Sequence, residues 1–246
     1  MEHLVSGARK LGFELTPRQL EQFGSYYQEL GEWNKRLNLT SITGFKEVQL
    51  RHFLDSLTVT LAGGWPTGAR VIDVGAGAGL PGLPLKILFA DMKLWLLEAT
   101  AKKAKFLLHL RKRLGLNDVE VIVGRAEEIA HQDIYREQFD LALSRAVARL
   151  PALVELTLPF LKIGGRLIAQ KKGNIDPELK QAAGAIEIMG GRLLEVKGVD
   201  LAELSDRRWL IVIEKRSPAP ERYPRRPGMP AKRPIIKAQL LDEPGD

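Results

Sequence analysis

The chain has 246 residues, of which 45% are hydrophobic and 27% are charged, a composition that supports a globular core and excludes disorder over most of the length. The absence of cysteine excludes disulfides, thiolate zinc sites and cysteine nucleophiles, and the formal net charge of +7 favours a polyanionic partner, above all nucleic acid. No apolar run is long enough to span a membrane, the N-terminus lacks a signal-peptide core, and the four histidines lack metal-ligand spacing. We therefore expect a cytoplasmic protein with no membrane partner and no metal.

Residues 1–66 are predicted to form a helical cap. The segment Thr16-Pro17-Arg18-Gln19 has the pattern of a capping box with proline at the first helical position. Apolar residues then recur at steps of three and four as far as Leu37, which predicts a helix with one apolar face. A second helical pattern runs from Leu50 to Leu61.

Residues 67–216 alternate between short apolar runs and helical patterns. This alternation predicts an α/β fold in which a mostly parallel sheet has helices on both faces. The expected strands are residues 71–74, 94–97, 119–123, 139–143, 166–169 and 209–213. The expected helices lie near residues 83–89, 101–114, 151–161 and 177–189.

Residues 217–246 differ from the rest of the chain in proline content and charge. They contain seven of the fourteen prolines, and the run from residue 222 to residue 237 carries six Lys or Arg and no acid. Because proline at this density is incompatible with a helix or an inner strand, we predict an extended basic arm. The prolines also allow the alternative that the arm folds back over the sheet.

The most informative stretch is VIDVGAGAGLPGLPLKI, in which a strand ends at Asp73-Val74 and is followed by Gly75, Gly77 and Gly79. Alternating glycines allow a tight turn and a close approach of a ligand to the backbone, as at the nucleotide sites of parallel sheets. The stretch also satisfies the GxGxxG pattern of dinucleotide sites. We favour S-adenosylmethionine over NAD because the carboxylate of Asp73 can bind an ammonium group, or its bridging water, and would repel a pyrophosphate.

Polar residues follow the next three strands at the same edge of the sheet. Glu98 ends the second strand, where an acid accepts hydrogen bonds from both ribose hydroxyls of either cofactor class. The turn at residues 124–127 could meet the adenine, and Ser144-Arg145 ends the fourth strand. Four successive strand ends predict one nucleotide site. The alternative is that Asp73 and Glu98 are ordinary capping or solvated acids.

These motifs resemble one known family. The glycine stretch, together with LLEATAKKAKFL, GRAEE and FDLALSRAVARL, is similar to the glucose-inhibited division protein B family of bacterial small-subunit ribosomal RNA guanine-N7 methyltransferases. WNKRLNLTSIT and RHFLDSL resemble its upstream motifs, and YPRRPGMPAKRPI resembles a tail found in part of the family. The resemblance runs from about residue 20 to residue 235. It implies a Rossmann-like class I methyltransferase fold that uses S-adenosylmethionine.

The resemblance also implies a substrate and a set of site residues. The target would be a guanine in the decoding-region loop of 16S ribosomal RNA, met as RNA or as the small ribosomal subunit, and we expect the protein to act as a monomer. The implied cofactor contacts are Gly75, Gly77, Leu80, Glu98, Ala99, Thr100, Ala126, Glu127 and Arg145, with Asp73 added from the charge argument. The family often has Asp where this chain has Glu98, and either acid can bind a ribose diol.

The residue chemistry agrees with attack by guanine N7. Methylation of cytosine C5 normally needs a cysteine, and methylation of the adenine amine usually needs two prolines and an aromatic residue after the fourth strand, where this chain has LSRAV. The N7 lone pair is free at neutral pH and needs only exposure and alignment. The lack of a recognisable acid–base pair is therefore expected for this reaction.

Arg145 and Lys172 are the predicted catalytic residues. Arginine is well shaped to read the O6 and N7 edge of guanine, so Arg145 is expected to orient either the base or the carboxylate of the cofactor. Alternatively, it pairs with Asp140 on the same strand. Lys172, after the fifth strand, is a second candidate for contact with the RNA or the base, whereas Lys171 is expected to be solvated.

Two basic segments are predicted to bind RNA phosphates. Residues 101–114 carry six Lys or Arg and no acid, whereas solvated helices usually interleave both signs, and the C-terminal arm adds further arginines. Polar residues also border the helical cap. The substrate candidates are Asn38, Arg51, His52, Lys102, Lys103, Arg111, Arg222, Arg225 and Arg226.

Three other functions remain open at this point. The first is a methyltransferase of the same fold that acts on another RNA, a small molecule or a protein. The second is a non-catalytic RNA-binding or assembly factor that keeps a cofactor pocket. The third is a nicotinamide dehydrogenase, for which no acid–base pair is recognisable.

Overall fold

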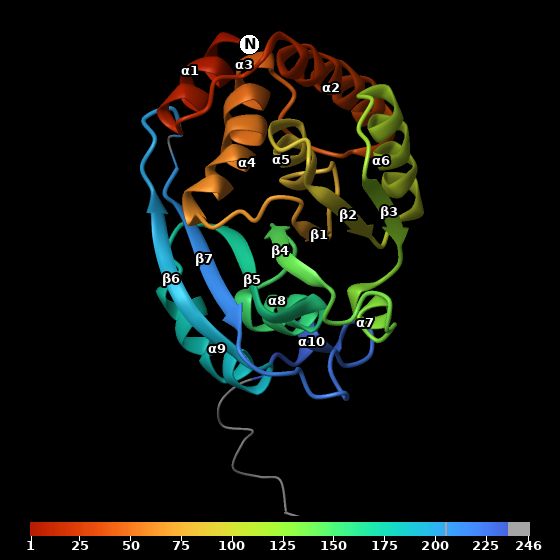
Figure 1. Cartoon of the computed structure of the whole chain (residues 1–246), viewed down its shortest axis with the longest axis vertical. Helices are drawn as coiled ribbons and strands as arrows, with labels where there is room; N and C mark the ends of the chain where they lie inside the picture. The colour runs from red at the N-terminus through yellow and green to blue at the C-terminus, as the bar shows by residue number, and fades with distance from the viewer. Residues whose placement is uncertain (205, 236–246) are drawn as a thin grey trace, which may run out of the picture.

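The computed structural model describes residues 1–204 and 206–235 and shows a twisted sheet flanked by helices (Figure 1). The seven strands have the order β3-β2-β1-β4-β5-β7-β6. Neighbours are parallel from β3 to β5, whereas β7 runs antiparallel to both β5 and β6. The strands are β1 (Arg70–Val74), β2 (Lys93–Glu98), β3 (Val119–Val123), β4 (Phe139–Arg145), β5 (Leu161–Lys172), β6 (Gly191–Val199) and β7 (Arg208–Lys215).

The six strands expected from the sequence are all present, which confirms the α/β fold with a mostly parallel sheet. The strand β6 was not expected. It lies at the edge of the sheet, it is largely exposed, and its pairing with β7 is irregular between Leu193 and Glu195. An exposed edge strand needs no continuous apolar run, so the signal that identified the buried strands is missing here.

Helices cover both faces of the sheet. On one side lie the N-terminal helices with α5 and α6, and on the other lie α7, α8, α9 and the C-terminal segment (Figure 1). The four helices expected in the α/β part are confirmed. The helical elements are α1 (Glu2–Lys10), α2 (Pro17–Leu37), α3 (Phe45–Val48), a π-helix (Gln49–Leu54), α4 (Asp55–Leu57), a 3-10 helix (Thr58–Ala62), α5 (Gly82–Leu88), α6 (Ala101–Arg113), α7 (Ala126–Ile129), α8 (Leu150–Thr157), a 3-10 turn (Leu158–Phe160), α9 (Asp176–Ile188) and α10 (Met229–Lys232).

The helix α2 begins as its sequence predicts. The side chain of Thr16 accepts a hydrogen bond from the N–H of Gln19 at 3.3 Å, and the Gln19 side chain accepts one from the N–H of Thr16 at 2.9 Å. The amide nitrogen of Gln19 also donates to the carbonyl of Ile87 at the end of α5, at 2.9 Å. The capping box therefore also connects the N-terminal helices to the α/β part.

The N-terminal helices share a hydrophobic core with the sheet. Phe23 of α2 and Phe53 of the π-helix are fully buried, with ring centroids 5.0 Å apart. They belong to the same cluster as Val71 of β1 and Leu143 of β4. A second cluster on the opposite face includes Phe139 and residues of α8 and α9. The cap is thus a structural part of one face of the sheet.

The longest helix, α2, has 21 residues and carries charged side chains along its length. Within residues 1–204 and 206–235, no helix is long and apolar enough to cross a membrane. The same residues contain no group of three or more metal-ligating side chains placed to hold a metal ion.

The segment after β7 lies against the body of the protein. The guanidinium group of Arg136 donates to the carbonyls of Tyr223 at 3.0 Å and Ala219 at 2.9 Å, and Ile235 is buried in the second core. The short helix α10 contains Pro230 in its first turn, where a missing N–H costs little. The prediction of an extended arm without helix is therefore wrong for residues 217–235, and the alternative of a folded-back segment is closer. Residues 236–246 of the predicted arm lie outside the described residues.

The carboxyl ends of the parallel strands meet at one edge of the sheet, and β7 begins there because it runs in the opposite direction. Arg145 ends β4, and Lys172 at the end of β5 pairs in register with Arg208 at the start of β7. The loop after β1 lies at the same edge. The predicted catalytic residues, and the predicted cofactor residues that follow β1 and β2, therefore lie at this edge.

Candidate active site

The glycine loop after β1 forms the centre of the site. Gly75, Gly77 and Gly79 have φ values of 75°, 57° and 86°, a left-handed conformation that favours glycine. The N–H groups of Gly75 and Ala76 donate to the carbonyl of Leu97 in β2 at 2.9 and 3.0 Å, which holds the loop on the sheet. A Cβ on Gly77 would have only the Gly75 carbonyl oxygen nearby, at 3.8 Å. Gly77 is therefore the point at which a ligand can approach the loop closely.

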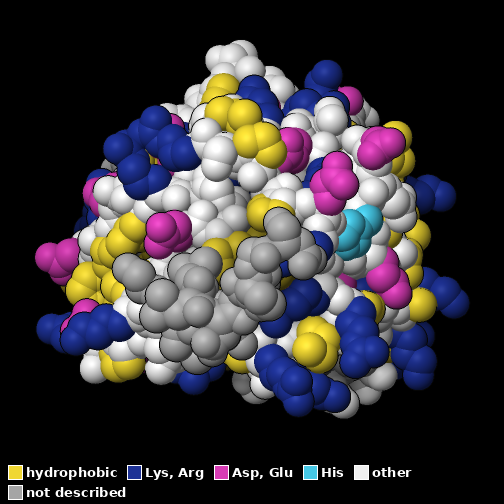
Figure 2. Space-filling view, turned by 90° about the horizontal axis from the view of Figure 1, so that it is seen from below, with side chains coloured by type: hydrophobic (Ala, Val, Ile, Leu, Met, Phe, Trp, Pro, Cys, Tyr) yellow, Lys and Arg dark blue, Asp and Glu magenta, His cyan; other side chains and the backbone are white. Residues whose placement is uncertain are grey.

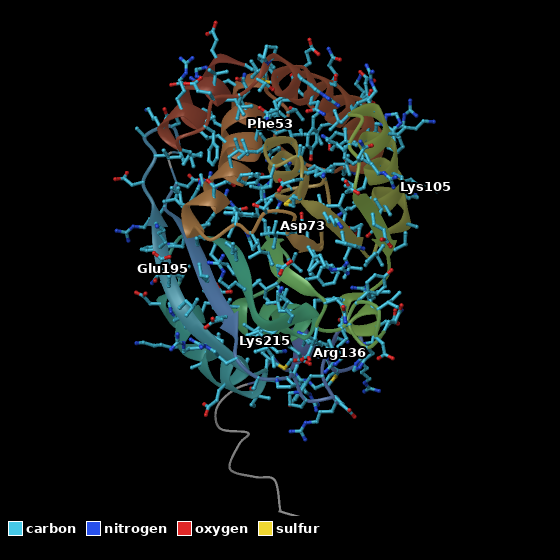
Figure 3. The ribbon with its side chains drawn as sticks, viewed as in Figure 1. Phe53, Asp73, Lys105, Arg136, Glu195 and Lys215 are labelled. Carbon is cyan, nitrogen blue, oxygen red and sulfur yellow. The ribbon has the colours of Figure 1, made fainter. Side chains whose placement is uncertain are left out.

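Asp73 lies beneath this loop, at the centre of the molecule (Figure 3). Its Oδ2 accepts a hydrogen bond from the N–H of Gly82 at 2.8 Å, and its Oδ1 has no partner among the described residues. Burial raises the pKa of Asp73 to about 7, against the opposing effects of the Gly82 hydrogen bond and the charge of Arg145. Asp73 thus fixes the end of the loop, and its second carboxyl oxygen is buried without a partner among the described residues.

Glu98 connects β2 to the glycine loop. Its Oε2 accepts from the N–H of Gly77 at 2.9 Å, and its Oε1 accepts from the N–H of Thr100 at 2.8 Å. Each carboxylate oxygen can accept a second hydrogen bond, so the group is able to bind a ribose diol. Ala99 and Thr100 are exposed beside it, whereas Leu80 is buried. The structure therefore brings the predicted cofactor residues of β1 and β2 together.

The residues predicted to flank the adenine begin α7. Ala126 and Glu127 are both buried, and Glu127 Oε1 accepts a hydrogen bond from the N–H of Gly228 at 2.9 Å. Gly228 belongs to the C-terminal segment, so this carboxylate attaches that segment to α7. A contact of Ala126 and Glu127 with adenine remains a prediction.

Tyr26 connects the cap to the glycine loop. It is fully buried in α2, and its hydroxyl donates to the carbonyl of Ala78 at 2.5 Å. Burial raises the pKa of Tyr26, so the hydroxyl keeps the proton that it donates. A Cβ on Gly79 would lie 2.8 Å from this hydroxyl. Neither Tyr26 nor this contact was expected from the sequence.

Tyr26→Phe is expected to weaken binding of the expected cofactor about three- to tenfold, because the Ala78 carbonyl loses its partner and the loop becomes less rigid. Calorimetric titration with S-adenosylmethionine measures the change. Tyr27→Phe is the matched control, since that hydroxyl makes only an exposed 3.4 Å contact with the carbonyl of Thr43. Equal affinity in both variants would show that the hydroxyl does not support the loop.

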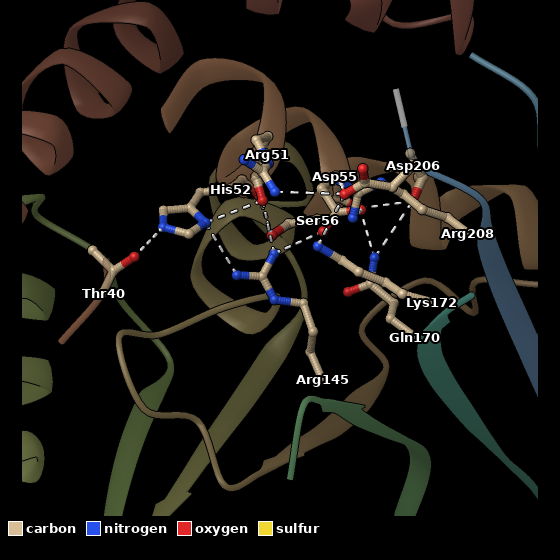
Figure 4. Close-up of polar contacts among 11 residues, drawn as sticks. Thr40, Arg51, His52, Asp55, Ser56, Arg145, Gln170, Lys172, Asp206 and Arg208 are labelled. Carbon is tan, nitrogen blue, oxygen red and sulfur yellow. Dashed lines mark hydrogen bonds and ion pairs between the residues drawn. The ribbon is translucent and has the colours of Figure 1, made fainter. Parts of the chain in front are cut away.

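Arg145 lies in a network of charged and polar groups at the end of β4 (Figure 4). Its Nη1 is 2.9 Å from Asp55 Oδ2 and 3.3 Å from the carbonyl oxygen of Arg51, and its Nη2 is 3.2 Å from His52 Nδ1. Asp55 is only 2% exposed, and its Oδ1 is 2.9 Å from Nη1 of Arg208. The Asp55 carboxylate therefore lies between two guanidinium groups and holds both.

The alternative that Arg145 pairs with Asp140 is wrong. Asp140 is at the beginning of β4, five residues before Arg145, which corresponds to roughly 16 Å along a strand. The Asp140 carboxylate accepts a hydrogen bond from the N–H of Arg70 at 2.8 Å and pairs with Lys162. The two residues therefore lie at opposite edges of the sheet.

His52 holds Arg145 from the side of the cap. Burial, assisted by the charge of Arg145, lowers the pKa of His52 to about 4, so the ring is neutral. The Nδ1 atom of His52 lies 3.2 Å from Nη2 of Arg145 and 3.0 Å from the carbonyl oxygen of Arg51, and its Nε2 lies 2.7 Å from Thr40 Oγ1. Both ring nitrogens of His52 therefore engage other groups of the protein, and a contact of His52 with RNA stays a prediction.

The NLTSIT segment positions this histidine. The side-chain amide of Asn34 donates to the carbonyl of Thr40 and accepts from its N–H, both at 2.8 Å. Asn38 ends α2 in a left-handed conformation with φ of 49° and starts the loop. The segment therefore places the Thr40 hydroxyl next to Nε2 of His52, and the other ring nitrogen of His52 contacts Arg145.

A pocket of about 220 Å³ opens beside this network. Its walls come from the ends of β4, β5 and β6, the start of β7 and the helical segment at Asp55. Lys172 lines it, half exposed, and burial together with the charge of Arg208 lowers the pKa of Lys172. Lys171 is not solvated as expected, because its Nζ contacts the carbonyl of Ala148 and Glu178 Oε1, both at 2.7 Å.

Three residues of this region were missed by the sequence analysis, namely Asp55, Gln170 and Arg208. The signal for Asp55 is a single acid within the apolar run FLDSLTVTL, since a buried carboxylate requires a cationic partner. No comparable signal marks Gln170 or Arg208, because their importance follows from the pairing of β5 with β7.

The basic helix α6 presents its cations on the surface, as expected. Lys102, Lys105, Arg111 and Lys112 are exposed, and Lys105 lies at the outer edge in Figure 3, away from Asp73. Lys103 is half buried. Arg113 pairs with Glu29 of α2 at 3.1 Å and so contributes to the contact between the two helices.

The cations of the C-terminal segment have different environments. Arg225 makes three hydrogen bonds to the fully buried carboxylate of Glu155, at 2.7 to 2.9 Å, so it stabilises the fold, and its contact with RNA stays a prediction. Arg222 lies over the ring of Tyr223, and Arg226 is exposed. Figure 2, which views the molecule from below, shows Lys and Arg side chains gathered on the face where α9 and α10 lie. Arg51 is partly exposed, 3.5 Å from Asp206.

Comparison with known proteins identifies relatives over nearly the whole chain. The model of a family described as rRNA small subunit methyltransferase G matches residues 19–207. A ribosomal RNA small subunit methyltransferase G of Dehalococcoides mccartyi is 52% identical over 236 residues, covering 96% of this chain and 100% of that protein. The protein of the same name from Roseiflexus castenholzii is 47% identical with the same coverage.

Solved structures share the fold at lower identity. A methyltransferase from Aquifex aeolicus, described as dependent on S-adenosylmethionine, aligns with a TM-score of 0.53 at 16% identity, covering 72% of this chain and 97% of that one. A variant of MtNAS in complex with S-adenosylmethionine aligns with a TM-score of 0.53 at 18% identity, covering 81% and 72%. These similarities confirm the predicted Rossmann-like methyltransferase fold.

Proposed function

The chain belongs to the rRNA small subunit methyltransferase G family, and on this premise we propose that it transfers a methyl group from S-adenosylmethionine to N7 of a guanine in the decoding-region loop of 16S ribosomal RNA. The observation that carries the proposal is that the glycine loop after β1 and Arg145 after β4 lie at one edge of the sheet. We place the reaction in the cytoplasm and assign it to the monomer.

The residues at this edge fit S-adenosylmethionine. Gly77 leaves open space where a side chain would stand, and Glu98 keeps lone pairs for the ribose hydroxyls. The unpartnered Oδ1 of Asp73 matches the ammonium group of the cofactor. A diphosphate at the same place would meet the carboxylate of Glu98 and lie close to the buried acid Asp73, which argues against a nicotinamide dinucleotide.

The reaction requires alignment more than proton transfer. S-adenosylmethionine supplies a methyl group on a positively charged sulfur, and guanine N7 is unprotonated at neutral pH. The protein therefore has to bind both groups, orient them and exclude water, a contribution worth up to about 7–11 kcal/mol. The neutral His52 is engaged with other groups of the protein, which agrees with a site that needs no general base.

Arg145 is proposed to orient the guanine rather than the cofactor carboxylate. Asp55, the Arg51 carbonyl and His52 hold its guanidinium group on the side of the 220 Å³ pocket, which Arg145 itself lines. The lone pair of N7 has to face the methyl group, so a hydrogen bond to N7 would block the reaction. Arg145 therefore donates to the neighbouring O6 alone.

The exposed cations of α6 are proposed to bind RNA phosphates. Such contacts provide affinity with little choice of sequence, and their strength depends on salt because each one releases counterions. Exposed cations of the C-terminal segment, such as Arg226, extend the same function to the lower face of the molecule.

Reversing the charges of Lys102, Lys103 and Arg111 to Glu is expected to weaken RNA binding and to reduce the slope of log affinity against log salt by roughly two to three, about 0.7–0.9 for each lost phosphate contact. Filter binding over a salt series measures the slope. The control reverses Arg18, Lys46 and Arg192, which lie on α2, α3 and β6, so both variants have the same net charge. A wild-type slope in the α6 variant would place the helix outside the RNA footprint.

Incubation of unmodified 16S ribosomal RNA, or of small subunits that contain it, with tritiated S-adenosylmethionine tests the proposed function. After digestion, mass spectrometry should identify 7-methylguanosine at a single position of the RNA. RNase treatment before the incubation should abolish labelling. Label in another nucleoside or in protein, or no label with either substrate, would overturn the proposal.

A further inference from the structure

The pocket beside Arg145 contains a glutamine whose orientation is fixed by the backbone. The amide nitrogen of Gln170, in β5, donates to the carbonyl oxygen of Asp55 at 2.6 Å and approaches Thr58 Oγ1 at 3.4 Å. A carbonyl oxygen only accepts, so the nitrogen has to be on that side of the amide. Gln170 Oε1 is then on the side of the amide away from the Asp55 carbonyl, and it has no hydrogen-bond partner among residues 1–204 and 206–235.

Donors surround the same pocket. Arg145, Lys172 and Arg208 line it, and Nε of the nearly buried Arg208 also has no partner within the described part of the chain. The remaining walls include the apolar side chains of Val199 and Leu210. The pocket therefore combines one unpartnered acceptor, Gln170 Oε1, with several cationic donors and apolar surfaces. A buried polar atom without a partner costs free energy that a ligand of matching pattern would recover.

This pattern matches guanine and not adenine. Guanine carries an acceptor at O6 next to donors at N1–H and the 2-amino group, whereas adenine has a donor amine at position six and an acceptor at N1. In the pocket, adenine would place its N1 lone pair against Gln170 Oε1 and its amine against cations. The apolar side chains of Val199 and Leu210 suit the face of a flat base better than a hydrated phosphate.

We propose that this pocket holds the target guanine, taken out of the RNA stack, and that Gln170 and Arg208 select it. This inference rests on the proposed function. Gln170 Oε1 accepts a hydrogen bond from the Watson–Crick edge of the base at N1–H, and the cations Arg145, Lys172 and Arg208 face O6. N7 then remains free on the side of the glycine loop. Recognition of an unstacked base by its edges is the usual way in which proteins read single-stranded RNA.

Gln170 would also act on the rate. As the bond from N7 to the methyl carbon forms and the bond from carbon to sulfur breaks, the electron pair moves to sulfur and the positive charge moves to the purine. A positively charged purine has a more acidic N1–H, so its hydrogen bond to Gln170 Oε1 strengthens in the transition state. Interactions that strengthen there raise kcat rather than only lowering KM.

The test compares two enzymes on two substrates. Wild type and Gln170→Met are assayed on 16S ribosomal RNA whose target guanine is either retained or replaced by 2,6-diaminopurine, which keeps N7 but has a lone pair at N1 and an amine at position six. Wild type should prefer guanine at least about 100-fold in kcat/KM. Gln170→Met should lose about 10- to 100-fold on guanine, mostly in kcat, and its preference should shrink about tenfold. Affinity for S-adenosylmethionine should not change.

Gln138→Met is the matched control, because the side chain of Gln138 is exposed near the other edge of the sheet and contacts only local backbone carbonyls. An unchanged preference in a folded Gln170→Met would overturn the assignment of the pocket. If Gln170→Met does not fold, the wild-type measurement is sufficient. Wild-type kcat/KM values for guanine and 2,6-diaminopurine that agree within about threefold would also overturn the assignment of the pocket. Failure of wild type to methylate guanine would instead refute the proposed function.

Discussion

Replacing Arg145 with methionine is expected to reduce methyl transfer to ribosomal RNA by on the order of 100- to 1,000-fold, the effect of removing one pre-positioned donor from an active site. The affinity for S-adenosylmethionine should stay within about threefold, because the guanidinium group is held toward the pocket by Asp55 and His52. Single-turnover methylation measures the rate, and calorimetry measures the affinity. Arg149→Met is the control, since Arg149 follows in the same segment and its side chain donates to Gln181, away from Asp55 and His52.

Stability has to be measured together with the rate, because Arg145 is one partner of a buried carboxylate. Asp55 keeps Arg208 at 2.9 Å in the Arg145 variant, so the loss should be smaller than for a buried charge left alone. Arg145→Lys keeps the charge without the planar fork and should show an intermediate rate. If the Arg145 variants lost affinity for the cofactor but kept the wild-type rate at saturating cofactor, Arg145 would have to be assigned to the cofactor carboxylate and not to the base.

The fold was predictable from the sequence where burial leaves a periodic pattern. The central strands are buried on both faces, and their apolar runs identified them. The strand β6 has its side chains mostly in solvent, and its pattern GRLLEVKGV gives no such signal. The capping box at Thr16 was predictable because it is a local interaction between residues three apart.

The site was predictable only in part, for a related reason. The glycine loop and Glu98 carry local signals, whereas the partners of Arg145 are about 90 residues away in the chain. The candidate partner of Arg145 in the sequence was therefore Asp140, which is near in sequence but lies at the opposite end of the strand. An acid isolated in an apolar segment is a better indication of a buried ion pair. Asp55 fits that description, and so does Glu155 of α8, which binds Arg225.

The same reasoning explains why the C-terminal segment was misjudged. Its composition indicates an exposed polycation, but the Arg225 side chain neutralises the buried Glu155, and carbonyls such as that of Ala219 bind Arg136. The prolines exclude a long helix and do not exclude packing against α7 and α8. Charge counted along a sequence therefore overstates the charge available to RNA.

The cap has a function in the site that its sequence did not reveal. Tyr26 of α2 supports the glycine loop, and His52 and Asp55 hold Arg145. Both halves of the proposed reaction centre, on the side of the cofactor and on the side of the base, therefore depend on helices outside the α/β part. Their shared hydrophobic core gives these contacts a rigid support.

Gly77→Val is expected to reduce the affinity for S-adenosylmethionine at least about 100-fold while the protein remains folded. The new side chain would occupy the open space where the cofactor approaches the loop, and it would hold a β-branched residue at φ of 57°. That conformation alone costs about 1–2 kcal/mol of stability. Calorimetry gives the affinity, and thermal denaturation gives the stability.

Gly115→Val separates these two effects. Gly115 follows α6 with φ of 60° and also has open space around its Cβ position, so it reproduces the backbone strain outside the glycine loop. Both variants should lose similar stability, and only Gly77→Val should lose the cofactor. Wild-type affinity in a folded Gly77→Val would mean that the ligand does not approach this loop. The assignment of the sheet edge as the cofactor site would then be wrong, because Asp73 and Glu98 are placed there through the same loop.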